Sequence, residues 1–506
     1  MPARRNTQQR TSIRPRIPRE ASALPLKDEA LFGNDAGEDE DPDVLASYFV
    51  AKEAFDPFFS RDRRVSVVRS RKGMGKSALL SKLAYDLQKH GGDDIVIHTT
   101  GSDLLGLARF DTSDHQLLQL RWKQVLCARI NLELGRRIGF AFSDTSMTLV
   151  EAAELASFKG RNLIGSLLAR ISSKSIPIEV KTPGSADSVA LLRRASENLG
   201  GTRVWLLVDD IDSTFIDTAE MAARTASFFS ACRSVIKDVQ GLNIRASVRT
   251  DVWTVLRTHE DLDKFEQYVI DLQWPATELE LILAKRIYAY IQRNLSSASP
   301  AWSLTPEENT DDLIRLVFTN RIRWGNASVP PFQPISIYAA GRPRWMTQLC
   351  RMAGVEAARV QVPRIGLAEI NTVMRDFGRY RLSDIYKEHL HQFGDLQRVV
   401  EVFGSGARRY QTDALLQKLA REYVMRVGAA KIPPIDGFPY ESPYQLAHLL
   451  FKVGFLLGRI GDPESATQAS FVRFDERPEL LTSFLNPDDA MLWEIHPSYR
   501  TILRIR

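Results

Sequence analysis

A lysine, a serine and two glycines stand close together in residues 70–77, which read SRKGMGKS. Holding nucleotide phosphates requires glycines where the backbone turns tightly, a lysine that reaches the oxygens, and a hydroxyl for Mg²⁺ at a helix start. Gly73, Gly75, Lys76 and Ser77 meet these requirements, although Ser70 stands where the full pattern has its first glycine. We therefore predict a phosphate-binding loop, against the alternative of a chance Gly-Lys-Ser between a strand and a helix. The predicted nucleotide contacts are Lys72, Gly73, Met74, Gly75, Lys76, Ser77 and Ala78, with Ser77 also a Mg²⁺ ligand.

Two adjacent carboxylates end an apolar run in residues 204–210, which read VWLLVDD. A buried strand that ends in this way would deliver Asp209 to the metal ion and Asp210 to the water that attacks the terminal phosphate. The alternative is a turn capped by aspartates, a role that Asp212 could fill in any case. Because a phosphate-binding loop lies upstream, we interpret Asp209 as a Mg²⁺ ligand and Asp210, together with Lys76, as catalytic.

Three arginines stand where they could contact the terminal phosphate. Arg249 follows the strand pattern of residues 244–248, and ligands bind at the carboxyl ends of the strands in open α/β sheets. Arg342 and Arg344 flank Pro343, which suits the first turn of a helix. We predict Arg249 and Arg344 as catalytic sensors of the terminal phosphate and Arg342 as a further nucleotide contact. The alternative is that all three are ordinary surface arginines or helix caps.

Two other groups of residues are weaker candidates. Arg321 and Arg323 could act as arginine fingers on a neighbouring subunit, which a single sequence does not decide. His389, His391 and Asp395 have no matching His-Asp pair nearby, so a solvated helical face is favoured over a metal site. No Ser-His-Asp spacing or paired-histidine metal motif indicates a second enzymatic activity.

The elements that must position these residues follow from the hydrophobic pattern. Residues 65–70 and 95–100 are predicted strands on either side of a periodic helix over 76–88, which makes a βαβ unit. Further strands are predicted at 204–208, 244–248 and 268–272, in alternation with helical patterns. We therefore expect an α/β fold built on a parallel P-loop sheet.

Beyond this sheet, helical patterns dominate. Two late strand patterns, residues 455–460 and 471–474, surround a turn-rich stretch and predict a winged-helix-like C-terminal module. The chain then divides into four parts: a flexible basic-then-acidic segment (1–45), a P-loop domain (46–275) with a helical insertion (102–200), a helical lid and sensor domain (276–400), and the winged-helix-like module (401–506).

The net charge of +5 comes entirely from the start of the chain. Residues 1–20 contain six arginines and one glutamate, and the rest of the chain is formally neutral. Nucleic-acid enzymes usually carry a basic footprint on the folded body, so this distribution weakens a DNA-binding interpretation without excluding it. Residues 35–43 contain six acidic residues, for which composition favours a solvated linker over an electrostatic clasp for a basic neighbour.

Composition indicates a globular chain in a reducing compartment. Three cysteines, at 127, 232 and 350, are odd in number and without CxxC spacing, which favours neither a disulfide framework nor a zinc site. The sequence contains neither an apolar run of about 18 residues nor an apolar stretch typical of a secretory signal. We therefore expect a cytoplasmic protein with no membrane partner.

With these residues in place, the chain resembles the STAND/AAA+-type P-loop ATPases, and more narrowly a bacterial family found in defence and mobile-element operons. The resemblance rests on residues 33–41, 72–80, 208–212, 249–251, 272–274, 341–344 and 495–497. It implies binding and slow hydrolysis of ATP with Mg²⁺, a homo-oligomer, and control of a separate effector protein encoded nearby.

We therefore predict an ATP-dependent switch or oligomeric scaffold, the ATPase component of an anti-phage defence system. One alternative is an origin-recognition-like AAA+ ATPase that binds DNA through its winged helix. Another is a nucleotide-binding scaffold that never hydrolyses its ligand, which Ser70 in place of glycine would favour.

Overall fold

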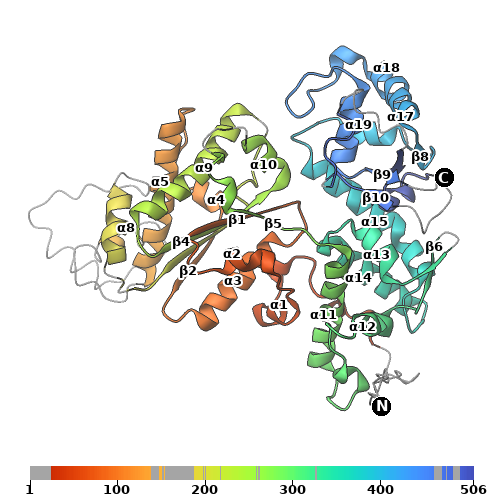
Figure 1. Ribbon diagram of the computed structural model, residues 1–506, viewed down its shortest axis with the longest axis horizontal. Coiled ribbons are helices and arrows are strands. Elements are labelled where there is room, and N and C mark those ends of the chain that lie inside the picture. Colours follow the sequence, from red (N-terminus) through yellow and green to blue (C-terminus); the bar gives the residue numbers. More distant parts are fainter. Residues whose placement is uncertain are drawn as a thin grey trace, which may run out of the picture.

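The computed structural model of the chain is shown in Figure 1. It describes residues 24–137, 148–150, 153, 187–197, 199, 201–216, 218–257, 259, 262–324, 327–460, 470–474, 476–482 and 491–505. In Figure 1 the α/β part lies on one side of the molecule. The helical region and the C-terminal module lie one above the other on the other side.

A five-stranded sheet forms the centre of the α/β part, in the order β2-β3-β4-β1-β5. Every neighbouring pair is parallel, and Ser70 pairs with Arg249 while Thr100 pairs with Asp209. The carboxyl ends of these strands therefore meet at one edge, and the predicted parallel P-loop sheet is confirmed. The strands are β1 (Val65–Ser70), β2 (Ile95–Thr100), β3 (Val204–Asp209), β4 (Leu242–Arg249) and β5 (Val269–Asp271).

Helices cover both faces of this sheet. On one face, Val68 and Leu207 share a core with helix α3 (Lys76–His90), which buries its leucines against the strands. On the other face, Val67 and Leu206 share a core with α5 (His115–Arg137) and α9 (Ala219–Asp238). Alternate residues of a strand point to opposite faces, so a sheet buried on both faces is largely apolar, although β4 also buries Asn243, Arg245 and Ser247. The shorter helices of this part are α1 (Pro42–Tyr48), α2 (Asp56–Phe59), α4 (Gly101–Leu105) and α10 (Thr250–Leu256).

The described part of the segment between β2 and β3 is mainly helical. Helix α5 packs against α9 and against α8 (Asp187–Glu197), and both α5 and α8 lie within the predicted helical insertion, 102–200. Most of residues 138–186 of this insertion lies outside the described residues.

After β5 the chain leaves the sheet through α11 (Ala276–Asn294) and enters the helical region. Two helices of this region reach the nucleotide loop. Arg344 of α14 (Pro343–Arg359) donates a backbone hydrogen bond to the carbonyl of Gly73 (3.3 Å), and Glu388 of α15 (Leu367–Glu388) accepts from the Lys72 amide (3.3 Å). The other elements are α12 (Thr310–Val317), the hairpin of β6 (Ile322–Trp324) and β7 (Ala327–Val329), α13 (Phe332–Ala339) and α16 (Leu396–Glu401).

The C-terminal module combines helices with a four-stranded antiparallel sheet in the order β10-β9-β11-β8. The predicted hairpin is present as β9 and β10, which confirms the winged-helix-like arrangement, whereas β8 and β11 were not predicted. The elements are β8 (Arg409–Tyr410), α17 (Thr412–Leu419), a π-helical turn (Ala420–Val424), α18 (Met425–Val427), α19 (Pro443–Lys452), β9 (Leu456–Ile460), β10 (Ser470–Val472), β11 (Leu492–Ile495) and α20 (Pro497–Arg500).

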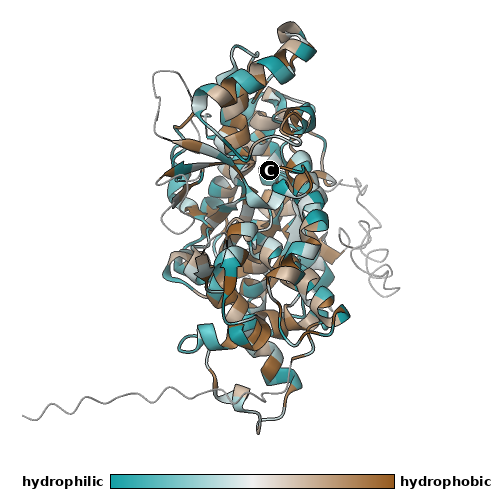
Figure 2. Ribbon diagram, turned by 90° about the vertical axis from the view of Figure 1, so that its right-hand side faces the viewer, coloured by the Kyte–Doolittle hydropathy of each residue, from teal (hydrophilic) through white to brown (hydrophobic). Residues whose placement is uncertain are grey.

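Apolar and polar residues alternate around most helices, as the mixed colouring in Figure 2 shows. Amphipathic helices of this kind bury one face against a core. Among the described residues, no helix combines the length and apolar character needed to cross a bilayer.

Candidate functional site

The predicted phosphate-binding loop connects β1 to α3. Gly73 and Gly75 have φ angles of +78° and +101°, which glycine adopts readily and other residues rarely do. Helix α3 begins at Lys76, so its unpaired amides and its dipole favour an anion at this point. The Lys76 side chain is buried, with Nζ 3.5 Å from the carbonyl oxygen of Ser70.

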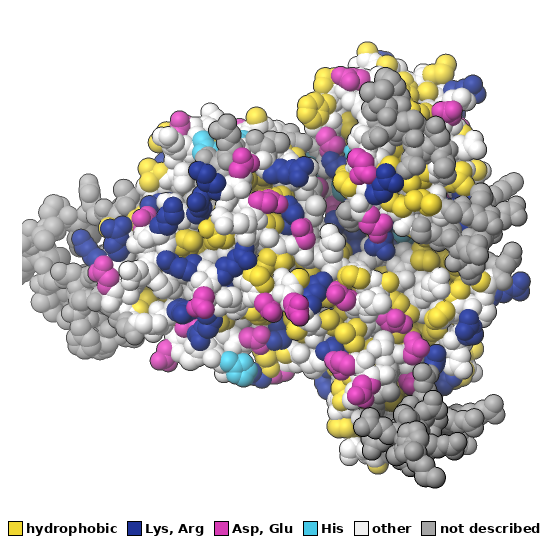
Figure 3. All heavy atoms as spheres, in the orientation of Figure 1, with side chains coloured by type: hydrophobic (Ala, Val, Ile, Leu, Met, Phe, Trp, Pro, Cys, Tyr) yellow, Lys and Arg dark blue, Asp and Glu magenta, His cyan; other side chains and the backbone are white. Residues whose placement is uncertain are grey.

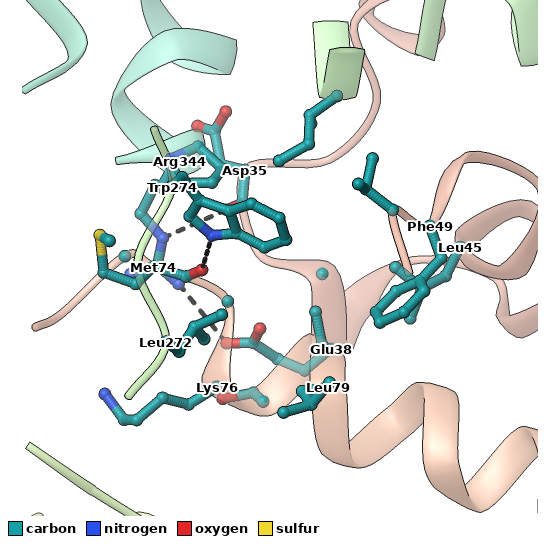
Figure 4. Close-up of a pocket in the computed structure, with 18 of the residues that line it drawn as sticks. Asp35, Glu38, Leu45, Phe49, Met74, Lys76, Leu79, Leu272, Trp274 and Arg344 are labelled. Carbon is teal, nitrogen blue, oxygen red and sulfur yellow. Dashed lines mark hydrogen bonds and ion pairs between the residues drawn. The ribbon is translucent and has the colours of Figure 1, made fainter. Parts of the chain in front are cut away.

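A pocket adjoins this loop (Figure 4), and residues from five separate parts of the chain line it. All seven nucleotide contacts predicted in the loop line this pocket, together with Asp210 and Arg344. Apart from the loop residues, Leu79 and Asp210, the pocket is lined by Asp35, Gly37, Glu38, Leu45, Tyr48, Phe49, Val50, Phe55, Leu272, Trp274, Ile282, Arg286, Pro343 and Arg344.

One half of the pocket is apolar and aromatic. Phe49 and Phe55 come from the segment before the sheet, and Trp274 follows β5. The indole Nε1 of Trp274 donates to the Met74 carbonyl (2.7 Å), and its ring stacks edge-on against Phe55. Phosphate-binding groups at one end and flat apolar walls at the other match the two halves of a nucleotide. Sequence reasoning missed this wall, because its residues come from segments that are remote in sequence.

The two carboxylates at the end of β3 have different surroundings. Oδ1 of Asp209 accepts hydrogen bonds from the Ser247 hydroxyl and from the Asp210 amide (2.9 Å). Asp210 lines the pocket in a left-handed conformation, with φ of +48°, and its amide also donates to the Ser247 hydroxyl (2.9 Å). Burial raises the pKa of Asp210, and the negative charge of Asp209 raises it further. Ser247 therefore holds the Asp209 carboxylate and the backbone of Asp210, a role that sequence reasoning did not assign.

The donor set at this edge fits Mg²⁺. Ser77 contributes a hydroxyl at the start of α3, and Asp209 and Asp210 contribute carboxylates at the end of β3. These are the hard oxygen ligands that Mg²⁺ prefers, usually alongside waters and substrate phosphates. Within the described part of the chain, no group of three or more His, Cys, Asp or Glu residues could hold a metal ion unaided.

Of the three predicted sensor arginines, only Arg344 lines the pocket. Arg249 donates to Asp212 from both its amide (2.8 Å) and its Nε (3.0 Å), and its guanidinium lies 3.7 Å from Asp251. The structure therefore places Arg249 at the predicted edge of the sheet but holds its side chain on carboxylates outside the pocket.

Arg342 is buried in the helical region rather than aimed at the nucleotide loop. Its guanidinium pairs with Glu388 (2.9 Å) and lies 4.4 Å from the centre of the Trp345 ring. The other carboxylate oxygen of Glu388 accepts from the Lys72 amide (3.3 Å), so Arg342 reaches the loop only through Glu388. Burial raises the pKa of Glu388, but Arg342 and His389 outweigh that effect and bring it to about 2.

The arginine-finger candidates lie on the β6–β7 hairpin. Arg321 is exposed and donates to the Ser328 hydroxyl (3.0 Å), and Arg323 is exposed on β6. Neither lines the pocket of its own chain. The structure holds one chain, so their action on a neighbouring subunit stays a prediction.

The solvated face predicted for His389 and His391 is wrong. His389 is 5% exposed and lies 2.7 Å from the Gln392 side chain, while His391 lies 3.2 Å from Asp251. Both follow the end of α15 and are buried where the helical region meets the end of β4. The sequence pattern of a single helix does not show whether another element packs over its polar face.

The acidic segment also differs from the solvated linker that its composition favoured. It forms a 3-10 turn, Gly37–Asp39, and helix α1, and it packs against α3. A Cβ on Gly37 would lie only 2.7 Å from the Cβ of Ala78, so the backbone here touches the nucleotide loop closely.

The three cysteines are buried and free.

No family model matches the sequence, and no curated protein matches it. The similar solved structures include the Cdc6p protein of Pyrobaculum aerophilum (12% identity, 92% of this chain and 98% of that chain, TM-score 0.33). They also include the ORC2 protein of Aeropyrum pernix (11%, 87% and 86%, TM-score 0.39) and the RuvB branch-migration motor of Thermotoga maritima (13%, 90% and 92%, TM-score 0.30). These likenesses are too weak to show the family or the function of this chain.

Proposed function

We propose that the protein binds ATP in this pocket and hydrolyses it slowly as a P-loop ATPase of the STAND/AAA+ type. The observation that carries the proposal is one pocket that joins the glycine-rich loop, Asp210 and Arg344 to an apolar aromatic wall. Transfer of a phosphoryl group to water requires mainly positioning and charge stabilisation, and these groups provide both.

Each part of the site has a role in this proposal. Lys76 and the first amides of α3 hold the phosphates, while Phe55 and Trp274 belong to the wall that receives the base. Asp210 accepts a proton from the attacking water, and Arg344 contacts the terminal phosphate. Mg²⁺, held by Ser77 and Asp209, would neutralise charge on the phosphate oxygens.

The direct test is the release of phosphate from ATP by the purified chain. We expect Mg²⁺-dependent hydrolysis on the order of 10⁻² per second, comparable to a P-loop switch that carries its own arginine. Chelation of Mg²⁺ with EDTA should stop it. ATP binding without any phosphate release would favour the non-hydrolysing scaffold, and absence of binding would refute the proposal.

We also propose that the ATPase assembles as a homo-oligomer and controls a separate effector in a defence system. The support is the sequence resemblance, together with exposed Arg321 and Arg323 on a hairpin outside the pocket. A neighbouring subunit that places one of these arginines at the pocket would complete the site across an interface.

A second candidate function is an origin-recognition-like ATPase that binds DNA. The winged-helix-like fold of the C-terminal module favours it, because such modules place a helix in the DNA groove. The charge of the module does not favour DNA binding, since residues 401–506 contain 13 basic and 13 acidic residues. On the face shown in Figure 3, acidic side chains lie among the basic ones.

A salt titration separates the two functions. If the module docks on protein, duplex DNA should bind only through the arginines of residues 1–20, and six such contacts would lose affinity about a thousandfold between 50 and 200 mM salt. Removal of residues 1–20 should then abolish DNA binding in a fluorescence anisotropy titration. Tight, sequence-selective binding by the shortened chain would instead establish the DNA-binding candidate.

A further inference from the structure

The acidic segment contributes a carboxylate to the pocket that the proposed function leaves unexplained. Oε1 of Glu38 lies 3.5 Å from Nη2 of Arg344, the arginine that faces the nucleotide loop. Nε of Arg344 donates to the backbone oxygen of Asp35 (3.2 Å), so two residues of one segment hold this guanidinium. Figure 4 shows Glu38 between Arg344 and Lys76.

Contacts on both sides fix the position of this segment. Nη1 of Arg286, a buried residue of α11, donates to the backbone oxygens of Phe32 (2.6 Å) and Asn34 (3.1 Å). Arg351 of α14 pairs with Asp35 (2.6 Å). Together with the close approach of Gly37 to α3, these contacts make Glu38 a built part of the pocket and not the tip of a loose loop.

The carboxylates that line the pocket disfavour the negative charge of a bound triphosphate. Glu38 and Asp210 both line this pocket. A terminal phosphate would add negative charge to the space that these carboxylates border. Glu38 and the terminal phosphate are both anions that draw on the single positive charge of Arg344, so the two compete for its guanidinium.

We propose that Glu38 competes with the terminal phosphate for Arg344 and thereby sets the preference of the pocket for ATP over ADP. The inference rests on the proposed function. We expect a diphosphate to end short of Arg344 and to leave the Glu38–Arg344 pair intact, whereas a triphosphate would compete with Glu38 for the guanidinium. Glu38 therefore weakens ATP binding relative to ADP binding, and it raises the ATP concentration at which the switch responds.

The test is a double-mutant cycle on the full chain with Mg²⁺. Glu38→Gln, Arg344→Ala and the double variant are titrated by calorimetry with ADP and with the non-hydrolysable analogue adenylyl imidodiphosphate. Glu38→Gln should tighten binding of the analogue about fivefold and change ADP binding by less than about twofold, since an exposed ion pair and one repulsive charge are removed. Arg344→Ala should weaken the analogue selectively, and Glu38→Gln should have a smaller effect in that background, because only its repulsion of the terminal phosphate is then removed.

Asp39→Asn is the matched control, because Asp39 is an exposed carboxylate in the same turn and does not line the pocket. It should leave both affinities unchanged. The inference is overturned if Glu38→Gln behaves like Asp39→Asn, if it weakens the analogue, or if its effect is as large without Arg344 as with it. A wild-type chain that binds neither ligand would refute the proposed function instead, so the two failures are distinguishable.

Discussion

Replacement of Lys76 by alanine is expected to weaken ATP binding by a hundredfold or more. The Lys76 ammonium is buried beneath the loop, where removal of one partner of a desolvated charge pair costs about 2–5 kcal/mol. Hydrolysis should fall below detection at ATP concentrations that saturate the wild-type chain. Equilibrium titration with a fluorescent ATP analogue measures the loss.

Lys89→Ala is the control for this substitution. Lys89 lies on the same helix but near its other end, where its ammonium pairs with Asp43 (2.6 Å) outside the pocket. Its removal changes the net charge by the same amount and should leave ATP affinity unaltered. If Lys76→Ala binds ATP as the wild type does while its thermal unfolding is unchanged, the loop is not the phosphate site.

The fold could be predicted largely from the sequence, because its main signals are local. Strands β1 and β2 have the predicted bounds, and α3 extends only two residues beyond its predicted end. A parallel sheet buried on both faces requires short apolar runs, and the intervening helices show leucines at helical spacing. The nucleotide loop was predictable for the same reason: its glycines, Lys76 and Ser77 lie within one short stretch.

The remainder of the site depends on contacts between residues that are remote in the chain. Glu38 and Arg344 are 306 residues apart, and Lys72 and Glu388 are 316 apart. A glutamate in an acidic run has the same sequence signature whether it is solvated or paired with an arginine. The same limit applies to Arg342. It is close to Arg344 in the sequence, but its buried ion pair with Glu388 holds its side chain away from the pocket.

Asp210→Asn is expected to bind ATP with wild-type affinity and to hydrolyse it about a hundred- to a thousandfold more slowly. An amide at this position cannot accept the proton of the attacking water, and general-base catalysis contributes roughly 10²–10⁴ in rate. Asparagine is the right substitution because residue 210 has a φ of +48°, a conformation that asparagine tolerates better than alanine does.

Two comparisons decide whether Asp210 has this role. Because burial and Asp209 raise the pKa of Asp210, wild-type hydrolysis should decline on acidification at a higher pH than an ordinary aspartate would cause, and Asp210→Asn should lose that step. Asp209→Asn should instead raise the Mg²⁺ concentration needed for hydrolysis, because Asp209 is the proposed metal ligand. If Asp209→Asn removes the pH step while Asp210→Asn raises the Mg²⁺ requirement, the two carboxylates have exchanged roles. If Asp210→Asn hydrolyses ATP at the wild-type rate, the attacking water is positioned by another group.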